Sequence, residues 1–527
     1  MSAPPPAVDD RPAATAAVDR PAVHRRRTAL AAALVGVFAF AVSVTGSWIP
    51  SAWADEAATM SAARRSLPEL WHMVHHVDAV HGLYYAMMHV WFEVVPYSVF
   101  TLRLPSAIAV GLAAAVTVLL GARLVGPWTG IVAGVVYAVL PRVTWAGTEG
   151  RSYAATTLFA VVLSLVLVVA VQHTAERRRR AWAWWVLYGV AVLCCGLLFV
   201  DMLLLVVAHG VTLLVGILLG GGPGGRRSHV RTALWWLVPT VVAGALLLPF
   251  VRLASGEADQ QLYYMGRMGW GPGIVKLVFL QQFFAGTKAM AAVAWLLVAV
   301  GAVGAVVVPR LRDRIPAVAL TLPAVFLPPA VVYVASVLVR PLFNPRYFTF
   351  ETPLVAIAIA LGLTVLPWRR TAVLGLALLV LLAVPQWGAQ RIPTAKDAST
   401  WGPATALLER ERAAEPAGTR DGVVYGPLPS HVNRTTEFVA ASYPRAFRGM
   451  HDLTLERSAV DIGQLWAQRR PASGPLSGLT RVDRVWFVGE PTADEPRLLQ
   501  RRLTAAGWRV AGQWQQGAFR LIEFERR

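Results

Sequence analysis

Residues 28–56 read TALAAALVGVFAFAVSVTGSWIPSAWADE and join a long apolar run to a pair of acidic residues. The apolar part has about the twenty residues that a membrane-spanning helix needs. It lacks a clear cleavage signature, so we interpret it as a retained membrane helix rather than a signal peptide. Asp55 and Glu56 follow at the water edge of the bilayer. Because a charged side chain in hydrocarbon costs several kcal/mol, acidic residues at this depth usually face a cavity or a site, although any loop also needs polar residues.

The composition is typical of an integral membrane protein. Of the 527 residues, 56% are hydrophobic and 15% are charged. The formal net charge of +19 is explained mainly by topology, and nucleic-acid binding has little support. The two cysteines, Cys194 and Cys195, are adjacent in an apolar run and provide neither a disulfide framework nor a metal site. Residues 1–27 are predicted to be a disordered cytoplasmic N-terminus.

Apolar runs of about twenty residues predict about eleven membrane-spanning helices. They lie at 28–48, 101–121, 127–147, 153–172, 181–199, 202–220, 232–251, 288–308, 316–338, 347–366 and 371–389. The division of 181–220 into two spans rests on a short break at 199–201. With a cytoplasmic N-terminus, the arginine clusters fall in alternate loops on the inner side, as the positive-inside rule requires. The odd number of spans then places the chain after residue 390 outside the cell membrane.

The segment 390–527 is predicted to be a soluble α/β domain. Strands are expected at 422–425 and 485–488 and as a pair over 508–524, with helices at 402–413, 457–469 and 496–507. The predicted fold class is therefore a multi-pass α-helical membrane protein, with a transmembrane domain over 28–389 and a C-terminal extracytoplasmic α/β domain.

Two long loops, 49–100 and 253–287, fall on the outer side. Helical periodicity over 67–95 predicts an amphipathic helix that lies in the interface. The second loop carries Tyr263 and Tyr264 beside glutamines, a mixture suited to a sugar or a head group. The same orientation collects most of the unusual polar side chains on this side of the membrane: Asp55, Asp78, His81, Arg103, Glu149, Arg151, Tyr263, Tyr264, Arg346 and Tyr347.

Sugar transfer at a membrane surface needs a base for the acceptor hydroxyl, cations for the phosphate leaving group, and side chains that orient the sugar. Asp55 is the best candidate for the base because it follows the first span. Glu56 is either a site residue or a first-turn residue that favours the start of a helix. Asp78 and His81 are three residues apart and would share a helix face. They could bind the acceptor, position the base or hold a divalent ion, although the sequence indicates no metal.

Two further pairs of residues fit the same chemistry. Glu149 and Arg151 either contribute to the site or form structural pairs with their neighbours. Arg346 offers a planar charged fork that matches phosphate oxygens, either of a substrate or of membrane lipids. No Walker-type glycine loop and no dinucleotide fingerprint occurs in a strand-to-helix context, so nothing indicates a nucleotide-sugar site or another cofactor.

Five short motifs follow one another in a recognisable order: WADE (53–56), DAVHGLYY (78–85), TLRLPS (101–106), TEGRSY (148–153) and RY (346–347). Over about 45–365 they resemble the bacterial mannosyltransferase branch of the glycosyltransferase C superfamily, which is akin to the protein O-mannosyltransferases and to the aminoarabinose transferase of lipid A. Gly150 departs from this pattern, because the related form is Glu-Ala-Arg-Ser-Tyr.

The resemblance implies an enzyme that takes a sugar from a polyprenyl-phosphate carrier and passes it to an acceptor on the outer face, with inversion at the anomeric carbon. It implies that Asp55 is the general base, that Glu56 supports it, and that Asp78 is the second acidic position. Arg151 and Arg346 would hold the carrier phosphate. The other candidate substrate-binding residues are His81, Tyr84, Arg103, Glu149, Tyr153, Tyr263, Tyr264 and Tyr347.

The sequence therefore predicts a membrane glycosyltransferase that moves a sugar, with mannose favoured, to a cell-envelope glycan, lipid or protein. A transporter of lipid-linked glycans is one alternative, but it would carry its charged residues at mid-span in broken helices. A non-catalytic scaffold of wall assembly is the other.

Overall fold

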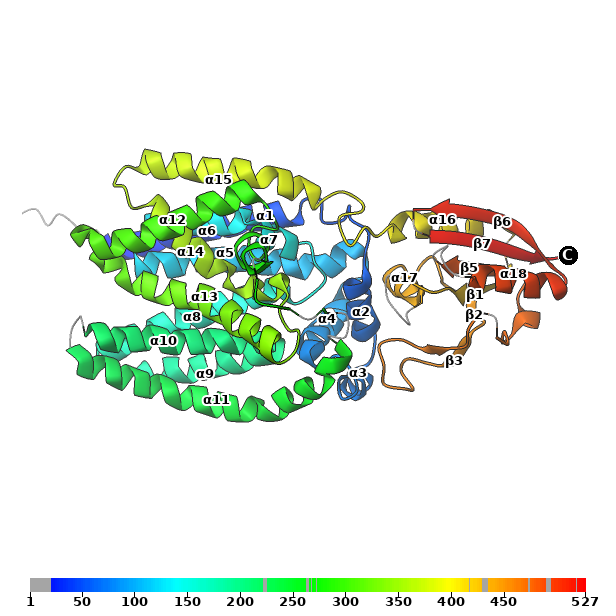
Figure 1. Cartoon of the computed structure of the whole chain (residues 1–527), viewed down its shortest axis with the longest axis horizontal. Helices are drawn as coiled ribbons and strands as arrows, with labels where there is room; N and C mark the ends of the chain where they lie inside the picture. Colours follow the sequence, from blue (N-terminus) through cyan, green and yellow to red (C-terminus); the bar gives the residue numbers. More distant parts are fainter. Residues whose placement is uncertain are drawn as a thin grey trace, which may run out of the picture.

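The chain forms a bundle of long apolar helices, a layer of short helices at one end of it, and an α/β domain beyond that layer (Figure 1). This is a computed structural model. It describes residues 20–220, 225–261, 265–266, 268–271, 273–416, 418–428, 435–472, 474–489, 494–517 and 519–527. Tyr263 and Tyr264 therefore lie outside the described residues.

Ten helices in the described part of the chain are long and apolar enough to cross a membrane. They include α1 (Arg20–Val44), α5 (Val99–Leu124), α8 (Tyr153–Ala175), α9 (Ala181–Leu198), α10 (Leu203–Leu219), α11 (Gly225–Gln261), α12 (Lys288–Val307), α13 (Ile315–Leu338), α14 (Thr352–Leu363) and α15 (Arg369–Ala389). Short 3-10 turns precede three of them, namely η2 (Val200–Met202), η4 (Pro309–Arg314) and η5 (Pro345–Glu351). The protein is thus a multi-pass membrane protein, and the predicted division of 181–220 into two helices is confirmed.

The eleventh predicted span, 127–147, is not a single helix. It is divided between α6 (Pro127–Val139) and α7 (Pro141–Ala146). Leu140 leaves the helical conformation between them, as expected for the residue before a proline. At 1.5 Å per residue, α6 is about 20 Å long, which is shorter than the roughly 30 Å hydrocarbon core.

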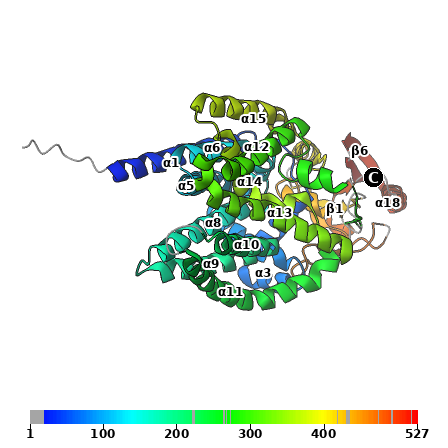
Figure 2. The ribbon, with the colours of Figure 1, turned by 60° about the vertical axis from the view of Figure 1, so that its left-hand side comes forward.

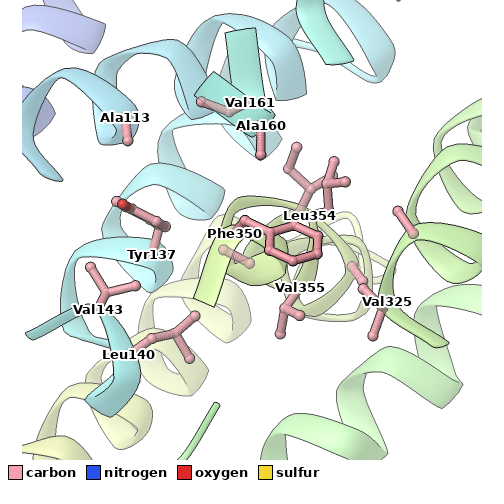
Figure 3. Close-up of a cluster of buried hydrophobic side chains, with 14 of the residues drawn as sticks. Ala113, Tyr137, Leu140, Val143, Ala160, Val161, Val325, Phe350, Leu354 and Val355 are labelled. Atoms are coloured by element: carbon pink, nitrogen blue, oxygen red, sulfur yellow. The ribbon is translucent and has the colours of Figure 1, made fainter. Parts of the chain in front are cut away.

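Helix α14 lies at the centre of the bundle. All its residues are buried, and Leu354 and Val355 pack with Phe350, Tyr137 and Leu140 (Figure 3). Both ribbon views place α13 and α14 between α12 and α15 on one side and α10 and α11 on the other (Figures 1 and 2).

Glycines allow the closest contact of α1 with α5. A Cβ on Gly36 would lie 2.8 Å from the Gly111 carbonyl oxygen, so the contact requires a residue without a side chain, as is common between membrane helices.

The layer of short helices differs from the single amphipathic helix predicted over 67–95. It contains α2 (Ala54–Ala63), α3 (Leu67–Val74), η1 (Ala79–His81) and α4 (Gly82–Val94). The helix breaks before Asp78, whose φ of +62° is left-handed, a conformation that an aspartate tolerates better than most residues. Asp78 and His81 therefore do not share a helix face, and that prediction is wrong.

The C-terminal domain is built on a five-stranded sheet with the order β2-β1-β5-β7-β6. The pairs β1–β2 and β1–β5 are parallel, whereas β5–β7 and β6–β7 are antiparallel. The strands are β1 (Asp421–Tyr425), β2 (His451–Asp452), β5 (Arg484–Gly489), β6 (Trp508–Gln516) and β7 (Phe519–Arg526), and a separate pair is formed by β3 (Leu455–Arg457) and β4 (Gln468–Arg469). The helices are α16 (Trp401–Ala413), α17 (Glu437–Ser442) and α18 (Glu495–Ala505), with the short turn η6 (Leu479–Arg481).

These elements confirm the predicted strands and two of the three predicted helices of this domain. The helix predicted over 457–469 is wrong, because the segment consists of turns between β3 and β4. Turn chemistry explains the difference. The Ser458 hydroxyl accepts the Asp461 N–H at 3.1 Å, and Gly463 has a φ of +59°.

The C-terminal domain packs directly on the short-helix layer. A shared apolar cluster contains Met60 and Tyr85 from the layer and Phe438, Val439 and Trp466 from the domain. Helix α2 thus lies between the membrane bundle and α17, so both parts of the chain fix its position (Figure 1).

Candidate active site

Asp55 and Arg346 meet at the end of the bundle that faces the short-helix layer. Asp55 lies in the first turn of α2, which Trp53 precedes in an extended conformation. Arg346 lies in η5, where its backbone N–H donates to the Asn344 side-chain oxygen at 3.3 Å. The distance from Arg346 Nη1 to Asp55 Oδ2 is 3.1 Å, and the two side chains are 20% and 26% exposed. The Arg346 guanidinium also lies 5.5 Å from the centre of the Trp53 ring. This pair is reachable by a ligand.

Glu56 points away from Asp55 and forms a fully buried ion pair with Arg103 of α5. Arg103 donates from Nε to Glu56 Oε1 at 2.7 Å and from Nη2 to Oε2 at 2.6 Å. The Gly150 N–H donates to Glu56 Oε1 at 2.9 Å. The other N–H groups of Arg103 donate to the carbonyl oxygens of Ser47, Pro50 and Ser51. Burial opposes ionisation of Glu56, but the charge and hydrogen bonds of Arg103 outweigh it, so the pKa of Glu56 is below its ordinary value.

Glu149 is also fully buried and binds two residues that the sequence did not identify. Its Oε2 accepts the Trp53 Nε1–H at 3.0 Å, and its Oε1 forms an ion pair with Lys396. Lys396 belongs to the segment that follows α15, and its ammonium also donates to the Thr148 carbonyl oxygen at 2.6 Å. Burial raises the pKa of Glu149 and lowers the pKa of Lys396, and the contact between the two charges opposes both shifts.

Asp78 is connected to the Asp55 segment through two side chains. The Tyr85 hydroxyl donates to Asp78 Oδ2 at 2.5 Å. Arg151 donates from Nη1 to the Tyr85 hydroxyl at 2.9 Å and to the Asp55 carbonyl oxygen at 3.3 Å. The Glu257 carboxylate of α11 accepts the Ala79 N–H at 2.9 Å and so fixes the chain beside Asp78.

His81 lies close to these groups. Its ring centre is 5.9 Å from that of Tyr85. Burial, and then the nearby charge of Arg151, hold the pKa of His81 well below its ordinary value of 6.5, although the carboxylate of Asp55 acts in the opposite direction. The Nδ1 atom is buried and has no hydrogen-bond partner among the described residues. A neutral imidazole beside a reachable carboxylate suits contact with a hydroxyl-bearing ligand.

Three predicted tyrosines have packing roles in this structure. Tyr84 is buried in the apolar cluster shared by the short-helix layer and the C-terminal domain. The ring of Tyr153 lies 5.1 Å from Trp145, and that of Tyr347 lies 5.6 Å from Phe199. These distances join ring centres. The three residues border the polar groups, and their predicted contact with substrate stays a prediction.

The structure adds Trp53, Tyr85 and Lys396 to the predicted set. Trp53 and Tyr85 belong to the motifs WADE and DAVHGLYY, from which Asp55 and Tyr84, but not these two residues, were predicted as site residues. Lys396 carries no comparable signal, because it lies in the segment predicted to belong to the soluble domain. The described residues contain no group of three or more His, Cys, Asp or Glu side chains that could hold a metal ion.

Comparison with known proteins identifies the fold. No protein-family model matches the chain, and no curated protein is similar to it in sequence. Two crystal structures of ArnT from Cupriavidus metallidurans match over 93% of this chain and 97% of theirs. The apo state has a TM-score of 0.54 at 13% identity, and the form bound to undecaprenyl phosphate has a TM-score of 0.52 at 14% identity.

An oligosaccharyltransferase is also similar, but more distantly. AglB from Archaeoglobus fulgidus, in complex with an inhibitory peptide and a dolichol-phosphate, has a TM-score of 0.47 at 12% identity over 95% of this chain and 74% of that chain. A TM-score this low supports no argument. The likeness to ArnT shows the fold alone, and it confirms the predicted fold class of a multi-pass helical membrane domain followed by an α/β domain.

Proposed function

We propose that the protein is an inverting glycosyltransferase, which moves a sugar from a polyprenyl-phosphate carrier to an acceptor hydroxyl on the outer face of the cell membrane. The observation that carries this proposal is the Asp55–Arg346 pair, in which a carboxylate and a guanidinium remain accessible at the end of a membrane bundle. Glu56 and Glu149 lie close by but are fully buried in ion pairs. Among these three acids, Asp55 is therefore the one that can meet a substrate.

The reaction assigns a separate task to each member of the pair. Asp55 accepts the proton of the acceptor hydroxyl, whose oxygen attacks the anomeric carbon from the side opposite the carrier. A new carbon–oxygen bond forms, the bond to the phosphate oxygen breaks, and polyprenyl phosphate leaves with the electron pair. Arg346 faces the developing charge of that phosphate with two parallel N–H groups. Donor binding therefore has to displace Arg346 from Asp55, which frees the carboxylate as the site fills.

The surrounding residues suit this assignment. Arg151 and Tyr85 hold the Asp55 segment through the hydrogen bonds to the Asp55 carbonyl oxygen and to Asp78. His81 is the neutral group beside the pair and is assigned to the acceptor. Undecaprenyl phosphate is bound by ArnT, which has the same fold, and this likeness favours a polyprenyl phosphate as the carrier here. We propose mannose as the sugar on the sequence resemblance, with an envelope glycan, lipid or protein as acceptor.

The orientation belongs to the same proposal. Helices α11 and α15 begin at the end of the bundle away from the C-terminal domain, beside Arg226 and Arg227 in one case and Arg369 and Arg370 in the other (Figure 1). The positive-inside rule places that end in the cytoplasm. The N-terminus would then be cytoplasmic, and the Asp55–Arg346 pair and the domain over 390–527 would face outward.

Transfer from radiolabelled polyprenyl-phosphate mannose by the purified protein in lipid tests the proposal. Asp55→Asn should lower turnover by about 10²–10⁴-fold, the usual effect of losing a general base. Asp461→Asn, at an exposed aspartate of the C-terminal domain, is the matched control and should retain full turnover.

Near-normal turnover by Asp55→Asn, with folding intact, would refute the assignment of the base. If the wild type neither turns over nor binds the carrier, the enzyme proposal fails and a scaffold takes its place.

A further inference from the structure

The segment that joins α15 to the C-terminal domain enters the candidate site. Residues 393 and 399 are tied by hydrogen bonds to the residues before α2. The Ser51 N–H donates to the Pro393 carbonyl oxygen at 2.8 Å, and the Ser399 hydroxyl donates to the Ala52 carbonyl oxygen at 2.6 Å. Between these two ties, Lys396 turns inward and is 4% exposed.

The backbone that directs Lys396 inward is strained. Asp397 and Ala398 have φ values of +50° and +52°, and two consecutive non-glycine residues in the left-handed region are unusual. Such conformations persist only where the surrounding structure enforces them, and they gather at functional sites. Directly before these two residues, the Lys396 ammonium lies against Glu149 and the Thr148 carbonyl oxygen.

From Lys396 a continuous set of contacts leads to the reachable pair. Lys396 binds one carboxylate oxygen of Glu149, and the other oxygen accepts the Trp53 Nε1–H at 3.0 Å. The face of the Trp53 ring lies 5.5 Å from the Arg346 guanidinium, which in turn contacts Asp55 at 3.1 Å. Trp53 also immediately precedes the helix that carries Asp55. An error in the orientation of this indole would therefore displace both members of the pair.

We propose that Lys396 is a positioning residue, which fixes Glu149 and through it the Trp53 indole on which Arg346 rests. The proposal deepens the proposed function and rests on it where activity is concerned. It assigns the C-terminal segment a role in setting the geometry of a site built otherwise from the membrane bundle.

Removing the charge of Lys396 alone leaves Glu149 buried without its cation, which disturbs both folding and Trp53. Two charge-neutral double variants separate these effects. The glutamine double variant, Lys396→Met with Glu149→Gln, retains an acceptor oxygen for the Trp53 N–H. The methionine double variant, Lys396→Met with Glu149→Met, has none. Both remove the buried charges, so both are expected to fold. Lys288→Met, at an exposed lysine that begins α12, is the control for loss of a lysine charge.

The first measurement needs no turnover. In protein labelled with 5-fluorotryptophan, the ¹⁹F resonance of Trp53 is assigned by its absence from Trp53→Phe. We expect it to shift in Lys396→Met, where Glu149 loses its cation, and in the methionine double variant. It should return to near its wild-type position in the glutamine double variant, where a neutral acceptor no longer needs the cation, and stay there in Lys288→Met. An unchanged resonance in Lys396→Met or in the methionine double variant would overturn the proposal, whether or not the protein transfers sugar.

The second measurement is steady-state sugar transfer. A misplacement of about 1 Å can cost about 10²-fold, so the methionine double variant should lose one to two orders of magnitude in kcat/KM for the donor, while the glutamine double variant keeps most of it. Equal activity of the two double variants would contradict positioning through Trp53. Absence of transfer by the wild type would refute the proposed function. The ¹⁹F resonance of Trp53 would then still decide whether Lys396 positions this indole.

Discussion

The buried Glu56–Arg103 pair gives the sharpest test of how the start of α2 is held. Arg103→Met would leave the Glu56 carboxylate with the Gly150 N–H at 2.9 Å as its remaining hydrogen bond among the described residues. Both side chains are fully buried, and removing one partner of such a pair typically costs about 3–5 kcal/mol. We expect that loss in the free energy of unfolding from Arg103→Met, and a similar loss from Glu56→Gln, which leaves the opposite charge unpaired.

The double variant Glu56→Met, Arg103→Met should lose much less than the sum of these two losses. It removes both charges, and its main cost is four backbone groups without partners: the carbonyl groups of Ser47, Pro50 and Ser51 and the Gly150 N–H. At about 1 kcal/mol for each group, the total is about 4 kcal/mol. The sum of the single losses is about 6–10 kcal/mol, so the two residues should show a coupling energy of about 2–6 kcal/mol, which reaches or exceeds the top of the usual range.

Unfolding by SDS in mixed micelles, followed by circular dichroism, measures these free energies. Arg410→Met is a suitable control because it breaks a pair in which the arginine is 72% exposed, and such pairs contribute about 1 kcal/mol or less. Strictly additive losses would refute the reasoning. So would a loss from Arg103→Met no larger than that of the control.

Four further predictions concern substrate, pH and topology. Arg346→Ala should weaken binding of polyprenyl phosphate more than binding of the acceptor, and Arg346→Lys should not restore it fully because the planar fork is lost; unchanged carrier affinity in a binding titration would count against this role. The pKa of Glu56 lies below 4.5, and a lowered acid pKa adds stability that is present above pH 4.5 and lost below it. In unfolding measured from pH 6 to 3, the wild type should therefore lose stability more steeply than Glu56→Gln. The pKa of His81 lies below 6.5, so its protonation should reduce the free energy of unfolding as the pH falls below 6.5. His81→Gln should therefore lose less stability than the wild type between pH 6.5 and pH 4. Equal losses in the two proteins would show that His81 is not buried in its neutral form. In a background with Cys194 and Cys195 replaced by serine, a cysteine at the exposed Gln500 should react with an impermeant thiol reagent in intact cells, and labelling only after lysis would reverse the proposed topology.

Much of the membrane architecture could be predicted from the sequence. Partition into a bilayer depends on the summed polarity of about twenty consecutive residues, and that sum is a local property. The predictions failed where a local break outweighed periodicity. Pro141 divides the predicted span 127–147, the left-handed Asp78 interrupts the predicted helix over 67–95, and the turns around Gly463 replace the predicted helix over 457–469.

The sequence also identified the motifs from which the polar groups come, but it could not distinguish their environments. Asp55 and Glu56 are adjacent in the chain and both are acidic. Helix geometry sends their side chains in different directions, so Glu56 meets Arg103 in the core while Asp55 meets Arg346 at the surface. The side chains that meet each acid come from distant helices, and no local pattern encodes those partners.

The sequence by itself determined the class of protein, the approximate positions of its apolar helices and the motifs that supply its polar residues. The length of an apolar run and the types of its residues are local properties of the chain. Only the tertiary structure decided which carboxylate remains reachable and which cations neutralise the others. It also brought Lys396, from beyond the last membrane helix, into contact with Glu149. The physical reason is that a buried charge is stabilised by groups adjacent in space, and the packing of α2 between the bundle and the C-terminal domain determines which groups those are.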